Sequence, residues 1–351
     1  MDAFYASVEA ERRDIEDEPI VVCVYSGRTE DSGAVSTCSY DARELGIHAA
    51  MPIKEAKRIA EQSTRDVHFV GMDKEYYDSF SDDIREQVLS KHADKIEKAS
   101  IDEFYLQTEV DEFEETLKAA ENMQRKVRDD FGVTCSVGIA PNKLVAKIAS
   151  DRDKPEGITA VTEEKMGEFM KDLDIGDIHG IGDKTVEKLN DLGISSVEEL
   201  AEADPSLLVR EFGEKQGLGL RKKARGEDDS EVEESIQKQI TRITTLDQNS
   251  SSYNHIRKIF PQLASDLVEK TEELNVNFQS VVIIAIDTDL QMHTRATSMK
   301  TPVNDKGIIL EKGEELLQEF LKENDLIIRR VGLRVKNLKQ RKGQKSFTDF
   351  T

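Results

Sequence analysis

Two adjacent acids, Asp102 and Glu103, lie inside an apolar stretch and are well suited to bind a metal ion. The pattern from Ile96 to Leu106 is typical of a β-strand, so uncompensated burial of two carboxylates there would cost several kcal/mol. A divalent cation would neutralise them, because Mg²⁺ is typically held by one or two carboxylates together with phosphate and water oxygens. The alternative is a solvated Asp-Glu turn, which is common in a chain this acidic.

The backbone around the two acids must be irregular if both are to reach one site. Adjacent residues of a regular strand point to opposite faces of the sheet. We therefore expect a hairpin tip or an irregular strand end at residues 100–104.

Strands and helices alternate in the sequence around this hairpin. The apolar run Ile20–Tyr25 predicts a buried strand, and residues 34–39 and 133–139 predict two more. Helices are expected at residues 51–59, 76–91, 113–131 and 142–152, the third of them ended by Gly132. This interleaving predicts an α+β sheet with helices on one face.

The composition limits the class of protein. No apolar run approaches the roughly 20 residues of a membrane helix, and no basic-then-apolar leader begins the chain, so we expect a cytoplasmic protein without a membrane partner. The formal net charge of -22 argues against a nucleic-acid partner, yet residues 326–348 contain no acidic residue and many basic ones. We interpret the dispersed acid, with no tryptophan, as the solubility adaptation of a halophilic host.

Five ordered blocks carry a resemblance to a known family. Phe4–Glu9, Tyr40–Arg43, Ser100–Glu103, Ser136–Lys143 and Asp153–Gly157 resemble the signature blocks of the Y-family DNA polymerases, translesion enzymes of the DNA polymerase IV type. The resemblance implies an archaeal, low-fidelity DNA-directed DNA polymerase that adds dNTPs to primer-template DNA using two Mg²⁺ ions. It also implies an α+β multidomain right hand: a ferredoxin-like palm, small fingers, a helical thumb with a helix-hairpin-helix, and a βαββαβ little finger.

The resemblance assigns roles to individual residues. Asp102 and Glu103 match the palm acids that hold the metals, with Glu103 nearest the metal that activates the primer 3'-hydroxyl. Tyr40, Arg43 and Lys154 match the residues that grip the triphosphate, and Tyr5 matches the steric gate against ribonucleotides. Without the family context, Tyr5 is an ordinary core tyrosine, Tyr40 and Arg43 form a solvated turn, and Lys154 is a charge at a helix C-terminus.

One position departs from the family pattern. The pattern is Asp-x-Asp, and its first Asp, a metal ligand, would precede Met1, whereas Asp2 matches the second Asp, which is not usually the ligand. We therefore expect the true start to lie upstream. The alternative is a catalytically weakened scaffold that binds DNA and clamp. A nucleotidyl cyclase, which also uses two metals on a ferredoxin-like palm, would not require the C-terminal features described next.

The second half predicts two DNA-binding regions. A helix, a Gly-Ile-Gly turn and a second helix over residues 177–189 resemble a helix-hairpin-helix, with Gly180, Gly182 and Lys184 near a DNA phosphate; a compact helical corner is the alternative. Residues 239–339 follow a β-α-β-β-α-β order. Their expected phosphate contacts, which position DNA without reading its sequence, are Arg242, Arg295, Arg330, Arg334 and Lys336.

The last residues resemble the box by which polymerases bind the sliding clamp, PCNA. Its anchors are Gln344, Phe347 and Phe350, and a disordered tail is the alternative. We expect a monomer. The predicted division is palm at 1–10 and 70–162, fingers at 11–69, thumb at 163–229, linker at 230–238, little finger at 239–339 and a flexible tail at 340–351.

Overall fold

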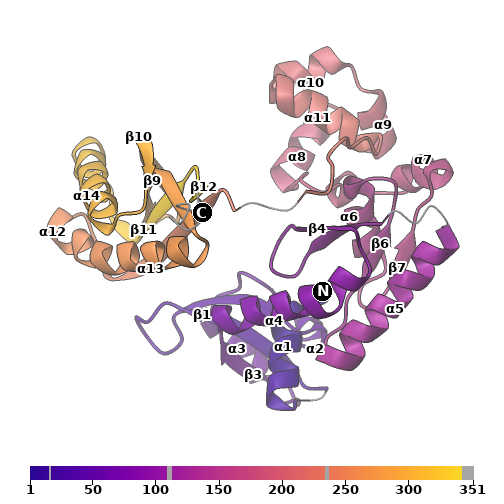
Figure 1. The fold of residues 1–351 in the computed structure, drawn as a ribbon, viewed down its shortest axis with the longest axis horizontal. Helices are drawn as coiled ribbons and strands as arrows, with labels where there is room; N and C mark the ends of the chain where they lie inside the picture. Colours follow the sequence, from indigo (N-terminus) through magenta and orange to yellow (C-terminus); the bar gives the residue numbers. More distant parts are fainter. Residues whose placement is uncertain (16, 109–112, 234–236, 342–351) are drawn as a thin grey trace, which may run out of the picture. The chain divides into compact units, whose positions relative to one another are not determined.

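The structure is a computed structural model that describes residues 1–15, 17–108, 113–233 and 237–341. The chain divides into two compact units (Figure 1). The first unit contains residues 1–24 and 34–235, and the second contains residues 25–33 together with the C-terminal part of the chain.

A three-stranded sheet organises the region after the first helix. It has the order β2 (Gly33–Cys38), β1 (Ile20–Tyr25), β3 (His68–Gly71), with β1 and β3 parallel. Helices α2 (Tyr40–Glu44) and α3 (Ile53–Ala60) adjoin it. Val21, Cys23 and Ile53 are fully buried in its core, because a strand covered on both faces must be apolar throughout. The predicted strand at Ile20–Tyr25 is thus confirmed.

The acid pair belongs to a region built from two short ladders and the helices around them. β4 (Lys95–Lys98) pairs antiparallel with β5 (Phe104–Gln107), and β6 (Val137–Ile139) pairs parallel with β7 (Ile158–Ala160). The helices are α1 (Phe4–Arg13), α4 (Lys74–Gln87), the 3-10 turn η1 (Leu89–Lys91), α5 (Phe113–Phe131) and α6 (Lys143–Arg152). Asp102 and Glu103 lie in the β4–β5 turn, as predicted.

Residues 1 and 2 link the two ladders. The Met1 nitrogen donates to the Asp102 carbonyl oxygen at 2.7 Å, and the Asp2 amide donates to the Thr134 carbonyl oxygen at 2.9 Å. The strand predicted for residues 133–139 is regular only at Val137–Ile139, so that prediction was too long. Its first half instead binds residue 2, and it still buries Val133 and Cys135.

Helices form the rest of the first unit. They are α7 (Glu163–Lys171), the 3-10 turn η2 (Ile175–Asp177), α8 (Asp183–Asp191), α9 (Val197–Glu202), α10 (Pro205–Phe212) and α11 (Glu214–Ala224). The glycine turn joins η2 to α8, so the element before it is one 3-10 turn rather than the α-helix expected. Ile178, Leu189 and Leu200 are fully buried beneath the turn.

The second unit is a sheet covered by helices on one face (Figure 1). The sheet order is β10 (Met292–Val303), β9 (Val276–Asp287), β11 (Ile328–Lys336), β8 (Gln239–Ser250), with antiparallel neighbours and a short β12 (Lys339–Gln340) beside β9. The helical segments are α12 (Tyr253–Ile256), the 3-10 turn η3 (Arg257–Ile259), α13 (Phe260–Glu273) and α14 (Lys306–Glu323). The β-α-β-β-α-β order is confirmed.

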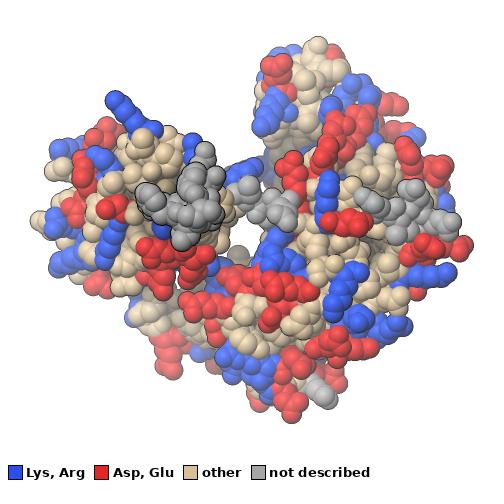
Figure 2. All heavy atoms as spheres, in the orientation of Figure 1, with Lys and Arg blue, Asp and Glu red and all other residues tan. Residues whose placement is uncertain are grey.

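Charged side chains of both signs cover the molecule. Figure 2 shows Asp and Glu spread over the face in view and interspersed with Lys and Arg. Within the described ranges, no helix combines the length and apolar character needed to cross a membrane.

Candidate active site and nucleic-acid interface

The β4–β5 turn presents the acid pair. The amides of Ala99 and Ser100 both donate to the Glu103 carbonyl oxygen, at 2.9 and 3.1 Å, which closes the tip. The Ser100 hydroxyl donates to Oδ1 of Asp102 at 2.7 Å. Both acids are half-buried. Because the tip is not a regular strand, the side chains of Asp102 and Glu103 need not point to opposite faces of the sheet.

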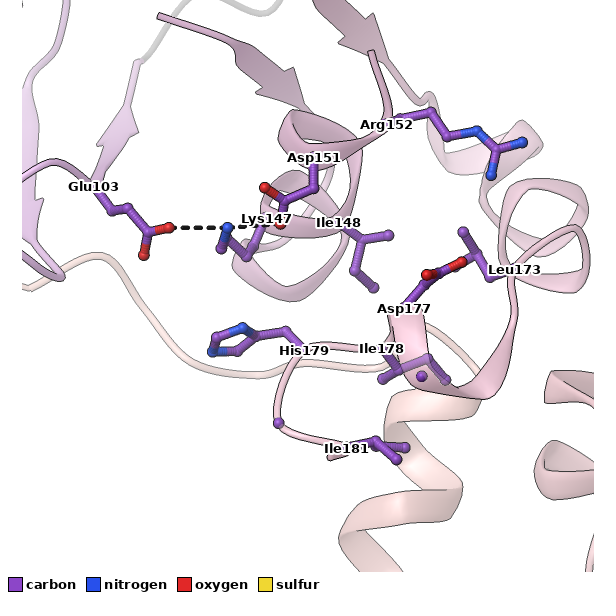
Figure 3. Close-up of a pocket in the computed structure, with 12 residues that line it drawn as sticks. Glu103, Lys147, Ile148, Asp151, Arg152, Leu173, Asp177, Ile178, His179 and Ile181 are labelled. Atoms are coloured by element: carbon purple, nitrogen blue, oxygen red, sulfur yellow. Dashed lines mark hydrogen bonds and ion pairs between the residues drawn. The ribbon is translucent and has the colours of Figure 1, made fainter. Parts of the chain in front are cut away.

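A chain of alternating charges extends from Glu103 to Lys147 and Asp151 of α6 (Figure 3), and then to Lys154, just beyond the end of that helix. Lys147 Nζ lies 2.9 Å from Glu103 Oε1 and 2.6 Å from Asp151 Oδ2. The other Asp151 oxygen lies 2.6 Å from Lys154 Nζ. Asp151 therefore links Lys147, which contacts Glu103, to Lys154, which is predicted to bind phosphate.

The electrostatics of this chain favour the charged forms. Burial opposes the charge of Lys147, but the hydrogen bonds that it donates to Asp151 and Glu103 outweigh burial and raise the pKa of Lys147. Burial likewise acts to raise the pKa of Asp151, yet hydrogen bonds from Lys147 and Lys154 hold that pKa below its usual value. Lys147 and Asp151 therefore both stay ionised near neutral pH.

The donor set fits a hard divalent cation. Asp102 and Glu103 offer carboxylate oxygens, the ligands that Mg²⁺ prefers. Across the described ranges, one group brings three metal-ligand atoms close together, Glu18, Asp66 and His68, and it lies on the exposed edge of the β1–β3 sheet. The acid pair thus supplies two ligands and requires others from a substrate or from water.

Asp2 is committed to structural hydrogen bonds. Its side chain is 1% exposed. Oδ1 accepts from the Ser136 hydroxyl at 2.8 Å, and Oδ2 accepts from the Glu156 amide at 3.0 Å. Both oxygens of Asp2 therefore connect residue 2 to the start of β6 and to the loop that carries Lys154.

Tyr5 lies beside the acid pair on α1. Its ring stacks on Tyr77, with centroids 4.6 Å apart and planes 20° from parallel. Burial, and next the charge of Asp102, raise the pKa of Tyr5. The Tyr77 hydroxyl donates to Oε1 of the fully buried Glu9 at 2.8 Å. Tyr5 therefore has a fixed platform on one side.

Tyr40 and Arg43 start the short helix α2, where the Ser39 hydroxyl caps the Ala42 amide. The Arg43 guanidinium lies over the Tyr40 ring, 4.7 Å from its centroid. Burial raises the pKa of Tyr40, and the charge of Asp2 raises it further. Tyr40 and Arg43 therefore stack on each other within α2.

A cavity of about 640 Å³ lies between Glu103 and the glycine turn. Glu103, Lys147 and Asp151 line one side, and residues 176–181 line the other (Figure 3). Gly180 has φ +83°, where other residues are strained, and Lys223 Nζ donates to the His179 carbonyl oxygen at 2.7 Å. Gly182 caps α8 with nothing near the position of a Cβ, and Lys184 is exposed.

The register of the second sheet places the arginines and the lysine predicted to contact DNA on two different faces of the sheet. Arg330, Arg334 and Lys336 alternate with the core residues of β11 and so lie on the face opposite the helices. Arg334 Nε donates to Thr241 Oγ1 at 2.8 Å. Within the described ranges, the buried Nε of Arg330 has no hydrogen-bond partner.

Two other predicted contacts lie on the helix-covered face. Arg295 pairs with the core residue Ile283, lies over the Phe320 ring and contacts Glu323 at 3.1 Å. Arg242 pairs with the buried Leu333. These two arginines therefore do not share a surface with Arg334. The clamp-box residues Gln344, Phe347 and Phe350 lie outside the described residues.

Sequence reasoning missed Lys147 and Asp151. Part of the signal was available, because 147 and 151 are four apart on one face of the predicted helix at 142–152. That Lys147 contacts Glu103, 44 positions earlier, requires the tertiary structure.

The site and fold together define a class. Two acids on a hairpin tip, a cationic helix face beside them and a glycine turn across one cavity are suited to transfer of a nucleotide on a nucleic-acid template. Models of three families match. These are the impB/mucB/samB family over residues 1–151, the thumb domain of DNA polymerase-iota over 176–228, and the impB/mucB/samB family C-terminal domain over 237–347.

Similar proteins cover the whole chain. DNA polymerase IV 1 of Methanosarcina mazei is 37% identical over 360 residues, spanning 100% of this chain and 97% of that protein. DNA polymerase IV of Nitrosopumilus maritimus is 34% identical, with 99% and 97% covered. A solved Y-family DNA polymerase chimera, Dbh-Dpo4(243-245)-Dbh, matches with TM-score 0.88 and 34% identity over 97% of this chain and 98% of that one.

The chain belongs to the Y-family DNA polymerases, in the DNA polymerase IV group. Enzymes of this family are metal-dependent, DNA-directed DNA polymerases that act in translesion synthesis. Nothing in the comparisons favours the alternative of a non-catalytic scaffold.

Proposed function

We propose that this chain extends a primer 3' end with dNTPs opposite damaged template by two-metal phosphoryl transfer. The observation that carries the proposal is the cavity in which Glu103 faces the thumb's glycine turn, since it supplies both a reacting site and a place for DNA beside it. A solved insertion ternary complex of Dbh DNA polymerase, 34% identical over 97% of this chain with TM-score 0.71, supports primer-template DNA and dNTP as substrates.

Asp102 and Glu103 would hold the two Mg²⁺ ions, which when bound stabilise the attacking and leaving oxygens. Ser100 keeps Asp102 oriented through its hydroxyl. Glu103 keeps one oxygen on Lys147 and would be the acid nearest the metal that activates the primer 3'-hydroxyl. The half-burial of both acids lowers the local dielectric, so their charges act more strongly than in bulk water.

Tyr40, Arg43 and Lys154 would bind the triphosphate, because a planar guanidinium can bind two phosphate oxygens at once and an ammonium adds a second positive charge. Tyr5 would act as the steric gate. Its ring is fixed by Tyr77 and cannot withdraw from a ribose 2'-hydroxyl. Asp151 would hold Lys154 in reach of the phosphates.

DNA would contact the backbone at Gly180 and Gly182, the ammonium of Lys184, and the open face of the little finger. Amides at the start of α8 would bind a phosphate there, and no atom lies within 4 Å of the position of a Cβ on Gly182. On the little finger we propose Arg330, Arg334 and Lys336 as phosphate contacts, since all three lie on the sheet face that the helices leave open.

The cellular setting is proposed from the sequence. The tail anchors Gln344, Phe347 and Phe350 would bind a PCNA-type clamp, and the enzyme would be a cytoplasmic monomer of a halophilic archaeon. We also keep the division into palm, fingers, thumb, linker, little finger and tail with the bounds given above.

Primer extension in molar KCl with Mg²⁺ tests the proposal. The chain should add dNTPs to a primer opposite an undamaged or abasic template, and the Asp102→Ala/Glu103→Ala variant should bind the same DNA without extending it. Binding without extension by the unaltered chain would refute the proposal.

A further inference from the structure

Lys147 occupies an unusual place for a lysine. Its side chain is only 13% exposed, although it is a charged residue near an open cavity. Buried ammonium groups need paired acceptors, and Lys147 has two, Glu103 Oε1 and Asp151 Oδ2. The ammonium is thus built into the site rather than placed on its rim (Figure 3).

The two contacts define a geometry for Glu103. Its Oε1 is bound to Lys147, so the carboxylate can offer its other oxygen to a cation in only a restricted orientation. Asp151 fixes Lys147 in turn, because its second oxygen is bound to Lys154. A glutamate with three rotatable bonds gains a defined position from this chain of contacts.

The contact between Lys147 and Glu103 should also lower the affinity of Glu103 for a metal ion. An ammonium hydrogen-bonded to one oxygen of a carboxylate lies within a few ångströms of any cation on the other oxygen, and the like charges repel. Lys147 should therefore weaken cation binding at Glu103 while it holds Glu103 where catalysis needs it.

We propose that Lys147 is a positioning residue that orients Glu103 for catalysis at the expense of metal affinity. This inference rests on the proposed metal site at Glu103. It predicts that loss of the ammonium changes metal binding and turnover in opposite directions. A merely structural lysine would lower both, because a loosened site binds and reacts less well.

Mn²⁺ binding to the DNA-free protein, followed by the electron paramagnetic resonance signal of free Mn²⁺, tests this without turnover. Lys147→Met, which keeps the length and fills the buried space, should tighten the Glu103-dependent site about tenfold. The gain should shrink as KCl is raised, because salt screens the repulsion. Lys147→Arg keeps the charge and should bind Mn²⁺ like the unaltered chain.

Lys143→Met is the matched control. Lys143 lies one turn earlier on α6, is similarly buried, and contacts Glu97 at 2.7 Å instead of Glu103. Its loss should leave Mn²⁺ binding at the site unchanged. In primer extension at saturating Mg²⁺, Lys147→Met should lower kcat about tenfold with a smaller change in KM for dNTP, and Lys147→Arg should restore part of kcat.

The Glu103→Gln variant distinguishes an error in the proposed metal site from an error in the proposed role of Lys147. If Glu103→Gln does not remove a Mn²⁺ site, the proposed metal site is wrong and the inference falls with it. If Glu103→Gln removes the site but Lys147→Met leaves its affinity unchanged or weaker, the metal site stands and the role of Lys147 is refuted.

Discussion

Tyr5 stacks on Tyr77 with ring centroids 4.6 Å apart, and the hydroxyl of Tyr77 is anchored to the buried Glu9. Tyr5→Ala should therefore open space beside the acid pair and raise ribonucleotide incorporation on the order of 100-fold. Tyr5→Phe keeps the ring and should retain discrimination. Single-nucleotide insertion with rNTP and dNTP measures both, and equal discrimination by all three proteins would exclude Tyr5 as the gate.

The acid pair should be needed for the reaction and dispensable for DNA binding. Glu103→Gln keeps the shape of the side chain but removes its charge, so kcat should fall about 10³-fold. Affinity for primer-template DNA, measured by fluorescence anisotropy, should change little. A Glu103→Gln enzyme with undiminished kcat would remove Glu103 from the reaction.

The two faces of the little finger should respond differently to charge removal. Arg334→Ala on the open face should weaken DNA binding and reduce the slope of log K against log[salt] by about 1. Arg295→Ala, whose side chain contacts Glu323 and Phe320, should leave that slope unchanged. Anisotropy titrations at several KCl concentrations compare them. The reverse ranking would place DNA on the helix-covered face.

Substitution of Gly180 should lower the stability of the protein, whereas substitution of Gly182 should lower its affinity for DNA. Gly180→Ala places a Cβ at φ +83°, 2.6 Å from Lys223 Nζ, and should destabilise the protein by about 1–2 kcal/mol. Gly182→Ala meets open space at an ordinary φ, so stability should hold while DNA affinity falls. Thermal unfolding and anisotropy separate the two effects. A Gly180→Ala protein as stable as the unaltered chain would contradict the strain.

His92 should make stability depend on pH near neutrality. Burial, and next the charges of Lys126 and Lys91, lower the pKa of His92 below its usual 6.5. The unfolded chain therefore takes up a proton first as pH falls, so stability drops from pH 6.5 downward until the folded pKa is reached.

His92→Gln cannot take up this proton and should lose less stability over the same range. Urea unfolding between about pH 7.5 and 5.5 gives the difference between the two proteins. Parallel pH profiles would show that His92 does not contribute.

Local signals were sufficient for much of the fold. The helix Phe113–Phe131 ends where predicted, because Gly132 takes φ +65° and stops it. The turn at Asp102 and Glu103 could be predicted because adjacent residues of a regular strand point to opposite faces and could not both reach one site. The βαββαβ order followed from the periodicity of six well-separated segments.

Contacts between distant segments could not be predicted. The Glu103–Lys147 ion pair depends on how α6 packs against the β4–β5 hairpin. The face of Arg295 depends on the register of β10 against β9, and a shift of one residue would reverse it. The strand at 133–139 was overpredicted because its first half binds Asp2.

The bonds of residues 1 and 2 also bear on how the protein folds as it is made. Asp2 binds Ser136 and Glu156, which are 134 and 154 positions away, and Met1 binds Asp102 at a separation of 101. A ribosome adds about 5–20 residues per second, so these partners emerge many seconds after residue 2. The two ladders therefore close late in synthesis, and until then their strand edges are open to pairing with other chains.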